Sequence, residues 1–408
     1  MTQRALEGIK VLDLSRVLAG PWSTQILADF GADVLKVELP GKGDDTRGWG
    51  PPFLKLPDGS EDPQESAYYL CANRNKRSAA IDLAKPEGAA LICKLAAEAD
   101  ILVENFKVGG LAKYGLDYAS LAAINPRLVY CSITGFGQTG PYKDRGGYDF
   151  VAQGMGGFMA ITGEESGGPL RAGVAMADLS TGMYATVSIM MALRHAERTG
   201  EGQHIDISLL DTQIAMLANQ ASNWLVGGIN PGRLGNRHPT VVPYKTFEVT
   251  DGIIIIAIGN DGQFRAFCHA MGVPEWAEDP RFVKGRDRLI NREAIEAMMQ
   301  DLVRGLEAKP LIDKLVALGV PAGPVNTVKD VFADPFVAAR ETVHRFTRED
   351  GVEIPTVAFP GKLSATPADY RHRPPKVGEQ SHEVLTDWLA LSAGELTALE
   401  SGGVIVQR

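Results

Sequence analysis

The sequence predicts an α/β fold divided between two domains. Residues 9–14 and 33–38 are strand-like, and Gly20-Pro21 between them suits the start of a helix, so the chain opens with a β-α-β unit. Such a unit implies that its two strands are parallel. The chain has 408 residues, whereas one hydrophobic core stops growing near about 250 to 300 residues, so we expect two cores.

The same alternation continues after this opening unit. It is typical of a Rossmann-like parallel sheet with helices on both faces, where ligands bind beyond the carboxyl ends of the strands. The expected elements are helix 21–30, helix 86–98, strand 101–104, helix 118–124 and strand 128–132.

The remaining sequence changes character twice. Residues 135–173 contain 12 glycines, which allow the backbone to approach a ligand closely, and an apolar helix follows over 179–198. Beyond Trp224, Thr250-Asp251-Gly252 joins two strand-like runs and predicts a hairpin. The later elements expected are strands 244–249 and 252–258 and helices 262–271, 292–306, 309–318 and 381–391.

These patterns suggest where the domains lie. We assign residues 1–210 to a large α/β domain, completed by a return segment over 335–408. Residues 225–330 form a smaller α+β domain. Compact domains of these sizes each bury a core of their own.

The composition excludes several classes of function. A net charge of -9 leaves no basic face for nucleic acid. The longest aliphatic run, residues 253–258, is far shorter than the roughly 20 residues that cross a bilayer. The first residues resemble no signal or transit segment, so we expect a cytoplasmic protein without a membrane partner. The four cysteines are too widely spaced for a metal site and are expected to be buried thiols.

Asp178 is the strongest candidate for chemistry. It lies where the glycine-rich stretch meets the apolar helix, so one interpretation is an N-cap whose carboxylate accepts backbone N–H bonds. The other interpretation uses the same place: a helix N-terminus keeps a carboxylate ionised, and an ionised carboxylate facing a ligand is a nucleophile.

A nucleotide-cofactor site is the obvious alternative for a β-α-β opening. Glu38, at the end of the second strand, resembles the acid that binds an NAD ribose. The loop after the first strand, residues 15–21, holds one glycine and no G-x-G-x-x-G pattern. NAD binding is therefore disfavoured.

Seven motifs occur in the order seen in class III CoA transferases, the CaiB/BaiF or formyl-CoA transferase-like family. The chain resembles this family from end to end, and most closely its succinyl-CoA:glutarate and other dicarboxylate-specific members. The motifs are VLAGP (17–21), GADVLKVE (31–38), NRNKRS (73–78), VENF (103–106), SITGFG (132–137), GYDFVAQ (147–153) and ADLSTG (177–182).

The resemblance implies an interlocked homodimer and a CoA transferase without metal or prosthetic group, for which the CoA thioester is a substrate. Asp178 would attack the donor thioester to form an acyl-aspartyl anhydride, and the CoA thiolate would convert this to an aspartyl-CoA thioester. The donor is expected to be succinyl-CoA and the acceptor a short carboxylic or dicarboxylic acid.

The resemblance also implies CoA contacts in the large domain. Relatives often have basic residues where Leu39 and Ala84 stand here, so we expect Lys85, Lys76 or Arg77 to supply charge for the phosphates. The implied contacts are Leu18, Ala19, Ile81, Leu83, Asn105, Phe106, Lys113, Gly147 and Tyr148.

For the carboxylate substrate we expect Arg47, Trp49 and His238, because a guanidinium binds a carboxylate through two hydrogen bonds. Two alternatives remain: a 2-methylacyl-CoA racemase or isomerase, and a non-catalytic acyl-CoA-binding protein. Racemases of this kind use a histidine where Tyr148 stands, and a phenol with a pKa of about 10 is a poor base.

Overall fold

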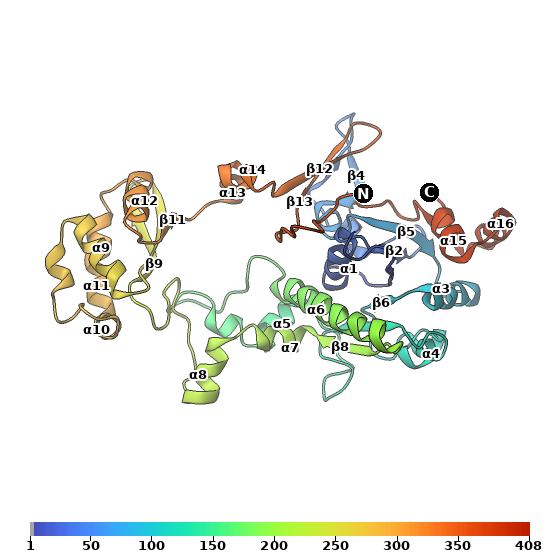
Figure 1. Ribbon diagram of the computed structural model, residues 1–408, viewed down its shortest axis with the longest axis horizontal. Helices are drawn as coiled ribbons and strands as arrows, with labels where there is room; N and C mark the ends of the chain where they lie inside the picture. The colour runs from blue at the N-terminus through green and yellow to red at the C-terminus, as the bar shows by residue number, and fades with distance from the viewer. Residues whose placement is uncertain (1–3) are drawn as a thin grey trace. The chain divides into compact units, whose positions relative to one another are not determined.

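The computed structural model describes residues 4–408 and divides them into two compact units (Figure 1). Unit 1 comprises the residues up to Phe158, Arg171–Gly227 and Ala338–Arg408. Unit 2 comprises Met159–Leu170 and Gly228–Val337. Each unit has a hydrophobic core of its own.

Unit 1 is built on a seven-stranded sheet, which confirms the predicted α/β class. All its strand pairs are parallel except that of β14 with β5. In spatial order the strands are β14 (Ile405–Val406), β5 (Lys76–Ile81), β2 (Asp33–Glu38), β1 (Lys10–Asp13), β6 (Ile101–Glu104), β7 (Val129–Thr134) and β8 (His204–Ser208).

Helices cover both faces of this sheet. Val11 of β1 lies in the core beneath α1 and α6, whereas its neighbour Leu12 lies in the core beneath α3 and α15, because successive strand residues point to opposite faces. The helices of unit 1 are α1 (Ala19–Asp29), α2 (Ala67–Leu70), α3 (Pro86–Glu98), α4 (Tyr118–Ala122), α5 (Asp149–Met155), α6 (Met176–Thr199), α7 (Leu209–Ala215), α8 (Asn219–Gly227), α15 (Ser381–Leu389) and α16 (Ala393–Ser401).

Unit 2 packs helices on a three-stranded antiparallel sheet. The predicted hairpin is present as β9 and β10, and its register places Ile254 opposite Phe247, both buried in the unit's core. The elements are β9 (Tyr244–Val249), β10 (Gly252–Ala257), β11 (Ala322–Pro324), α9 (Asp261–Met271), α10 (Gly285–Ile290), α11 (Arg292–Val303), α12 (Ala308–Ala317) and α13 (Val328–Ala333).

Three expectations need correction. Strand β5 was not predicted because it begins with Lys76 and Arg77. The Lys76 ammonium is buried because it pairs with Asp13 at 3.0 Å and also donates to the Pro21 carbonyl and Asn73 amide oxygens. The helix predicted over 179–198 begins earlier, at Met176. Cys131 and Cys268 are buried as predicted, but Cys71 is exposed and Cys93 is only partly buried.

Two further features bear on function. Within residues 4–408, none of the helices combines the length and apolar composition that crossing a membrane requires. The same residues contain no group of three or more His, Cys, Asp or Glu side chains arranged as metal ligands.

Gly182 allows α6 to lie against α1 (Figure 1). A Cβ at this position would lie 2.7 Å from the Ala19 carbonyl oxygen, and that backbone atom has no freedom to move away. We therefore expect Gly182→Ala to lower the free energy of unfolding by about 1 to 3 kcal/mol, measured as a shift of the urea midpoint. Gly394→Ala on α16 is the control, because its Cβ meets no atom within 4 Å. Equal midpoints for the two variants would contradict this account of the α1–α6 contact.

Candidate active site

Asp178 lies in the first turn of α6, but it does not cap the helix. The N-cap residue is Ala175, and the capping carboxylate comes from Asp149 at the start of α5. Asp149 Oδ1 accepts hydrogen bonds from the Ala177 and Asp178 backbone N–H groups at 2.7 and 3.4 Å. The predicted N-cap role of Asp178 is therefore wrong, and its carboxylate is left available for another partner.

The surroundings of Asp178 change its acidity. Burial is the main cause, and the nearby Asp149 carboxylate adds to it; together they raise the pKa of Asp178 from 3.8 to about 7. A carboxyl group with a pKa near neutrality is typical of catalytic sites. The expectation that the helix end alone keeps Asp178 ionised thus needs correction.

Tyr68 of α2 is a neighbour of Asp178 that the sequence did not indicate. Burial, followed by the Asp178 and Asp149 charges among other causes, raises the pKa of Tyr68 to about 12, so its phenol stays protonated at neutral pH. The Tyr68 ring packs edge-on against Trp49 with centroids 5.2 Å apart. Trp49, a predicted substrate residue, therefore contacts a side chain that interacts electrostatically with Asp178.

A cavity of about 850 Å³ in unit 1 brings Asp178 together with most of the predicted CoA contacts. Its volume lies within the range of about 300 to 1,000 Å³ that is usual for ligand sites. The predicted residues among its lining are Leu18, Ala19, Asn105, Phe106, Gly147, Tyr148 and Asp178.

A second, mainly apolar cavity of about 230 Å³ lies next to it in the same unit. Ile81 and Leu83 line this cavity, together with Tyr114. Phe106 and Arg16 line both cavities, so they mark the place where the two meet. Lys113 lines neither, and its ammonium lies 4.6 Å from the Tyr114 ring centroid.

The turn that contains Asn105 and Phe106 follows β6 and is stabilised by the side chain of Glu104, the last residue of that strand. Glu104 Oε2 accepts a hydrogen bond from the Phe106 N–H at 2.8 Å. Burial raises the pKa of Glu104 to about 7. The Asn105 side chain is itself occupied by both backbone groups of Arg16, at 2.9 and 2.6 Å. Its amide therefore shapes the cavity wall.

Arg47 is not open to a substrate carboxylate. It is 2 % exposed, and its Nε and Nη2 atoms bind the two oxygens of Glu38 at 2.8 and 2.7 Å. Tyr69 and the Pro375 carbonyl oxygen accept further bonds from Nη2. The structure therefore offers no support for the prediction that Arg47 binds substrate, because Glu38 already provides its bidentate carboxylate.

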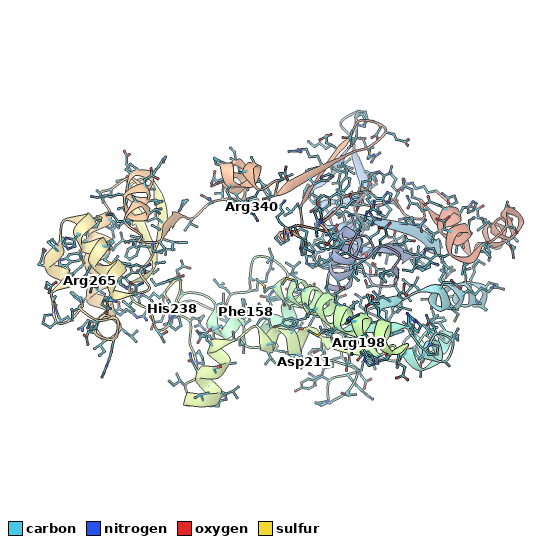
Figure 2. The ribbon with its side chains drawn as sticks, in the orientation of Figure 1. Phe158, Arg198, Asp211, His238, Arg265 and Arg340 are labelled. Carbon is cyan, nitrogen blue, oxygen red and sulfur yellow. The ribbon has the colours of Figure 1, made fainter. Side chains whose placement is uncertain are left out.

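His238, labelled in Figure 2, belongs to unit 2. The residues that line the two cavities belong to unit 1. Its Nδ1 accepts hydrogen bonds from the Thr240 and Val241 N–H groups, so the imidazole stabilises its own loop. These contacts leave Nε2 as the ring atom available for other partners.

The three residues expected to supply phosphate charge are engaged elsewhere. Lys76 is buried and binds Asp13, Arg77 pairs with Asp33 at 2.6 Å, and Lys85 donates to the Gly402 carbonyl oxygen at 2.7 Å. The structure therefore offers no support for their predicted role.

Known proteins resemble this chain over nearly its full length. A succinate–glutarate CoA-transferase from Agrobacterium fabrum is 50% identical over 382 residues, 94% of this chain and 95% of that protein. The human succinyl-CoA:glutarate CoA-transferase is 41% identical, covering 99% of this chain and 90% of that protein. A solved CaiB/BaiF family protein from Brucella suis has a TM-score of 0.84 and 48% identity, over 95% of this chain and 100% of that one.

These similarities agree with the site geometry and with the family whose motifs the sequence contains. The model for "CoA-transferase family III" matches residues 6–381. The chain belongs to CoA-transferase family III and is a transferase enzyme.

Proposed function

We propose that this enzyme moves CoA from an acyl-CoA donor, with succinyl-CoA as the first candidate, to a short dicarboxylic acid such as glutarate. The similar proteins named for succinate and glutarate support this choice of substrates. The proposal depends chiefly on one observation: Asp178 lines a cavity large enough for a ligand. Its carboxylate is partly desolvated and is not used to cap α6.

The proposed reaction conserves one thioester. The Asp178 carboxylate attacks the donor carbonyl, the C–S bond breaks, and CoA thiolate leaves a mixed anhydride. The thiolate then attacks the Asp178 carbonyl carbon, which releases the donor acid and leaves an aspartyl-CoA thioester. The acceptor carboxylate then attacks the aspartyl-CoA carbonyl, which releases CoA thiolate and forms a second mixed anhydride, the reverse of the second step. Thiolate attack on the acceptor carbonyl forms the new thioester and restores the Asp178 carboxylate, the reverse of the first step.

Several groups near Asp178 fit this sequence. In the proposed complex the larger cavity takes the thioester and pantetheine, and the small apolar cavity at Ile81 and Leu83 takes the adenine. The Tyr68 phenol, protonated at neutral pH, is a hydrogen-bond donor for an oxyanion formed at each carbonyl. Asp149 accepts hydrogen bonds from the Ala177 and Asp178 N–H groups and so fixes the backbone at Asp178.

We also propose that the enzyme is a homodimer. Unit 1 exposes a series of large apolar side chains that a monomer would leave in water, and exposed apolar patches of this kind mark association surfaces. A second copy of this chain is the partner that the family resemblance implies. The side chains are Phe150, Val151 and Met155 on α5, Met183, Tyr184, Val187, Met190 and Met191 on α6, and Trp224, Leu225 and Val226 on α8.

Placing a charge on the apolar α6 face tests the dimer. Val187 is 50% exposed, so Val187→Glu is expected to leave the fold intact but to produce monomers, because a buried unpaired carboxylate is costly. Ile124→Glu, at an exposed position beyond α4, is the matched control. Sedimentation velocity that finds a monomeric wild type, or an unchanged Val187→Glu dimer, would contradict the proposal.

Covalent labelling tests whether Asp178 forms the proposed covalent intermediates. With wild-type enzyme and succinyl-CoA, hydroxylamine or borohydride trapping followed by mass spectrometry should place the modification on Asp178. Asp178→Asn keeps the shape but removes the nucleophilic charge, so exchange should fall by about a thousandfold or more and labelling should vanish. Normal exchange by this variant would disprove the mechanism, and α-proton exchange without CoA transfer would favour the isomerase alternative.

The pH dependence follows from the raised pKa of Asp178. Since the ionised form is the nucleophile, kcat/KM should rise with pH through about 7 as Asp178 loses its proton. Asp149→Asn retains an oxygen that caps α6 but removes the charge, so the inflection should move to lower pH. Glu104 also has a pKa raised to about 7, so Glu104→Gln is the control and should leave the inflection in place. If the inflection moves in Glu104→Gln and not in Asp149→Asn, the titrating group is Glu104, and the assignment to Asp178 is wrong.

A further inference from the structure

A phosphate-containing ligand that occupies both cavities is stabilised by a cation where they meet. The lining of the small cavity includes two basic residues, Arg16 and Lys36. Lys36 is fully buried, and its ammonium binds Asp44 at 2.8 Å and the Ser15 carbonyl oxygen at 3.0 Å. Leu39, in the same lining, adds no charge. Arg16 is therefore the one cation of this lining with an accessible head group.

Arg16 also lies at the right place. It lines both cavities, as Phe106 does, and its guanidinium carbon lies 5.7 Å from the Phe106 ring centroid. The Arg16 side chain is 47% exposed. A ligand that occupies both cavities therefore lies beside this side chain.

The partner of Arg16 can be exchanged without leaving a carboxylate unpaired. Arg16 Nη1 binds Asp45 Oδ2 at 2.9 Å, and Lys42 binds the other oxygen of Asp45 at 2.5 Å. If a phosphate replaces Asp45 as the partner of the guanidinium, Asp45 is still paired with Lys42. Guanidinium pairs well with phosphate because it offers several N–H donors in one plane.

The Arg16 backbone is unusually well fixed for a loop. Asn105 binds its N–H and its carbonyl oxygen, and Asp44 accepts from the next N–H, that of Val17, at 3.2 Å. Val17 has φ 72°, a conformation that is strained for a β-branched residue and that persists only when its surroundings enforce it. These contacts fix the Arg16 backbone, while the guanidinium has Asp45 as its partner and remains exposed.

We propose that Arg16 binds the phosphate groups of the CoA substrate where the two cavities meet, and that Asn105 and Asp44 are positioning residues that hold it there. This inference rests on the proposed function, since it assumes that acyl-CoA is the ligand. It assigns Asn105 a role through Arg16 and not through direct contact with CoA.

Substrates with and without phosphate test the assignment of Arg16. Arg16→Gln should raise the KM for succinyl-CoA roughly tenfold to a hundredfold with little change in kcat, because the lost contact is remote from the reacting carbonyl. With succinyl-pantetheine, which has no phosphate, wild type and Arg16→Gln should have the same kcat/KM. The thioester of dephospho-CoA, which lacks the 3′-phosphate, shows which phosphate Arg16 binds. If Arg16→Gln still raises the KM for this substrate, Arg16 binds the diphosphate. If the substitution no longer changes the KM, Arg16 binds the 3′-phosphate.

Arg127→Gln is the matched control, since Arg127 is exposed in the turn before β7 and lines neither cavity. An unchanged KM for succinyl-CoA in Arg16→Gln, or an equal loss with succinyl-pantetheine, overturns the proposal. Asn105→Ala should show the same phosphate-dependent loss, and adding Val17→Gly should restore part of it, because glycine adopts positive φ without strain. No restoration would mean that Asn105 contacts CoA directly.

Failure of the wider proposal is distinguishable from failure of this one. If wild-type enzyme neither transfers CoA nor binds it in calorimetry, the proposed function and the Arg16 assignment fall together. If transfer and Asp178 labelling persist while Arg16→Gln behaves as wild type, only the phosphate assignment is wrong.

Discussion

A group of six charges, among those buried in unit 1, is the constraint on which the rest of this structure depends. Three acids pair with three bases, so the group has no net charge: Lys36 with Asp44 at 2.8 Å, Lys76 with Asp13 at 3.0 Å and Arg47 with Glu38 at 2.7 Å. Removing one member of a buried pair leaves an uncompensated charge and costs about 3 to 5 kcal/mol. All six side chains are therefore required together.

This charge group connects the fold to the site. Lys36 donates to the Ser15 carbonyl oxygen, and Asp44 accepts from the Val17 N–H, so two of the six charges hold the loop that forms the cavity wall. The same group fixes Arg47, because its partner Glu38 also accepts hydrogen bonds from the Asp44 N–H and from the Ser78 hydroxyl. Sheet, loop and cavity are thus held by one set of hydrogen bonds.

Asp178 combines two properties that a carboxylate nucleophile needs. Burial beside Asp149 raises its pKa, which makes the ionised form less stable and hence a stronger nucleophile. The N-terminal end of α6 offers a favourable potential to negative charge that develops on or near it. Because Asp149 takes over the capping of α6, Asp178 does not have to satisfy the backbone, and its oxygens remain available for chemistry.

Local sequence determined much of this protein. The residues of β2 and β6 specify strands because their side chains face a core on both sides. The short motifs, ADLSTG at 177–182 among them, indicated the family to which the chain belongs. Local pattern also indicated the hairpin of unit 2, where Thr250-Asp251-Gly252 provides the turn. These features depend on neighbours close in the chain, so they are readable without a structure.

Only the tertiary structure decided which charges are free. Arg47, Lys76 and Arg77 have the residue type expected of a ligand site, but Glu38, Asp13 and Asp33 from other segments neutralise them. Conversely, Tyr68, Asp149 and Arg16 gained their places through contacts across the chain. A charged side chain is available to a ligand only if its own partner can be exchanged at little cost, and the identity of that partner is a property of the folded chain.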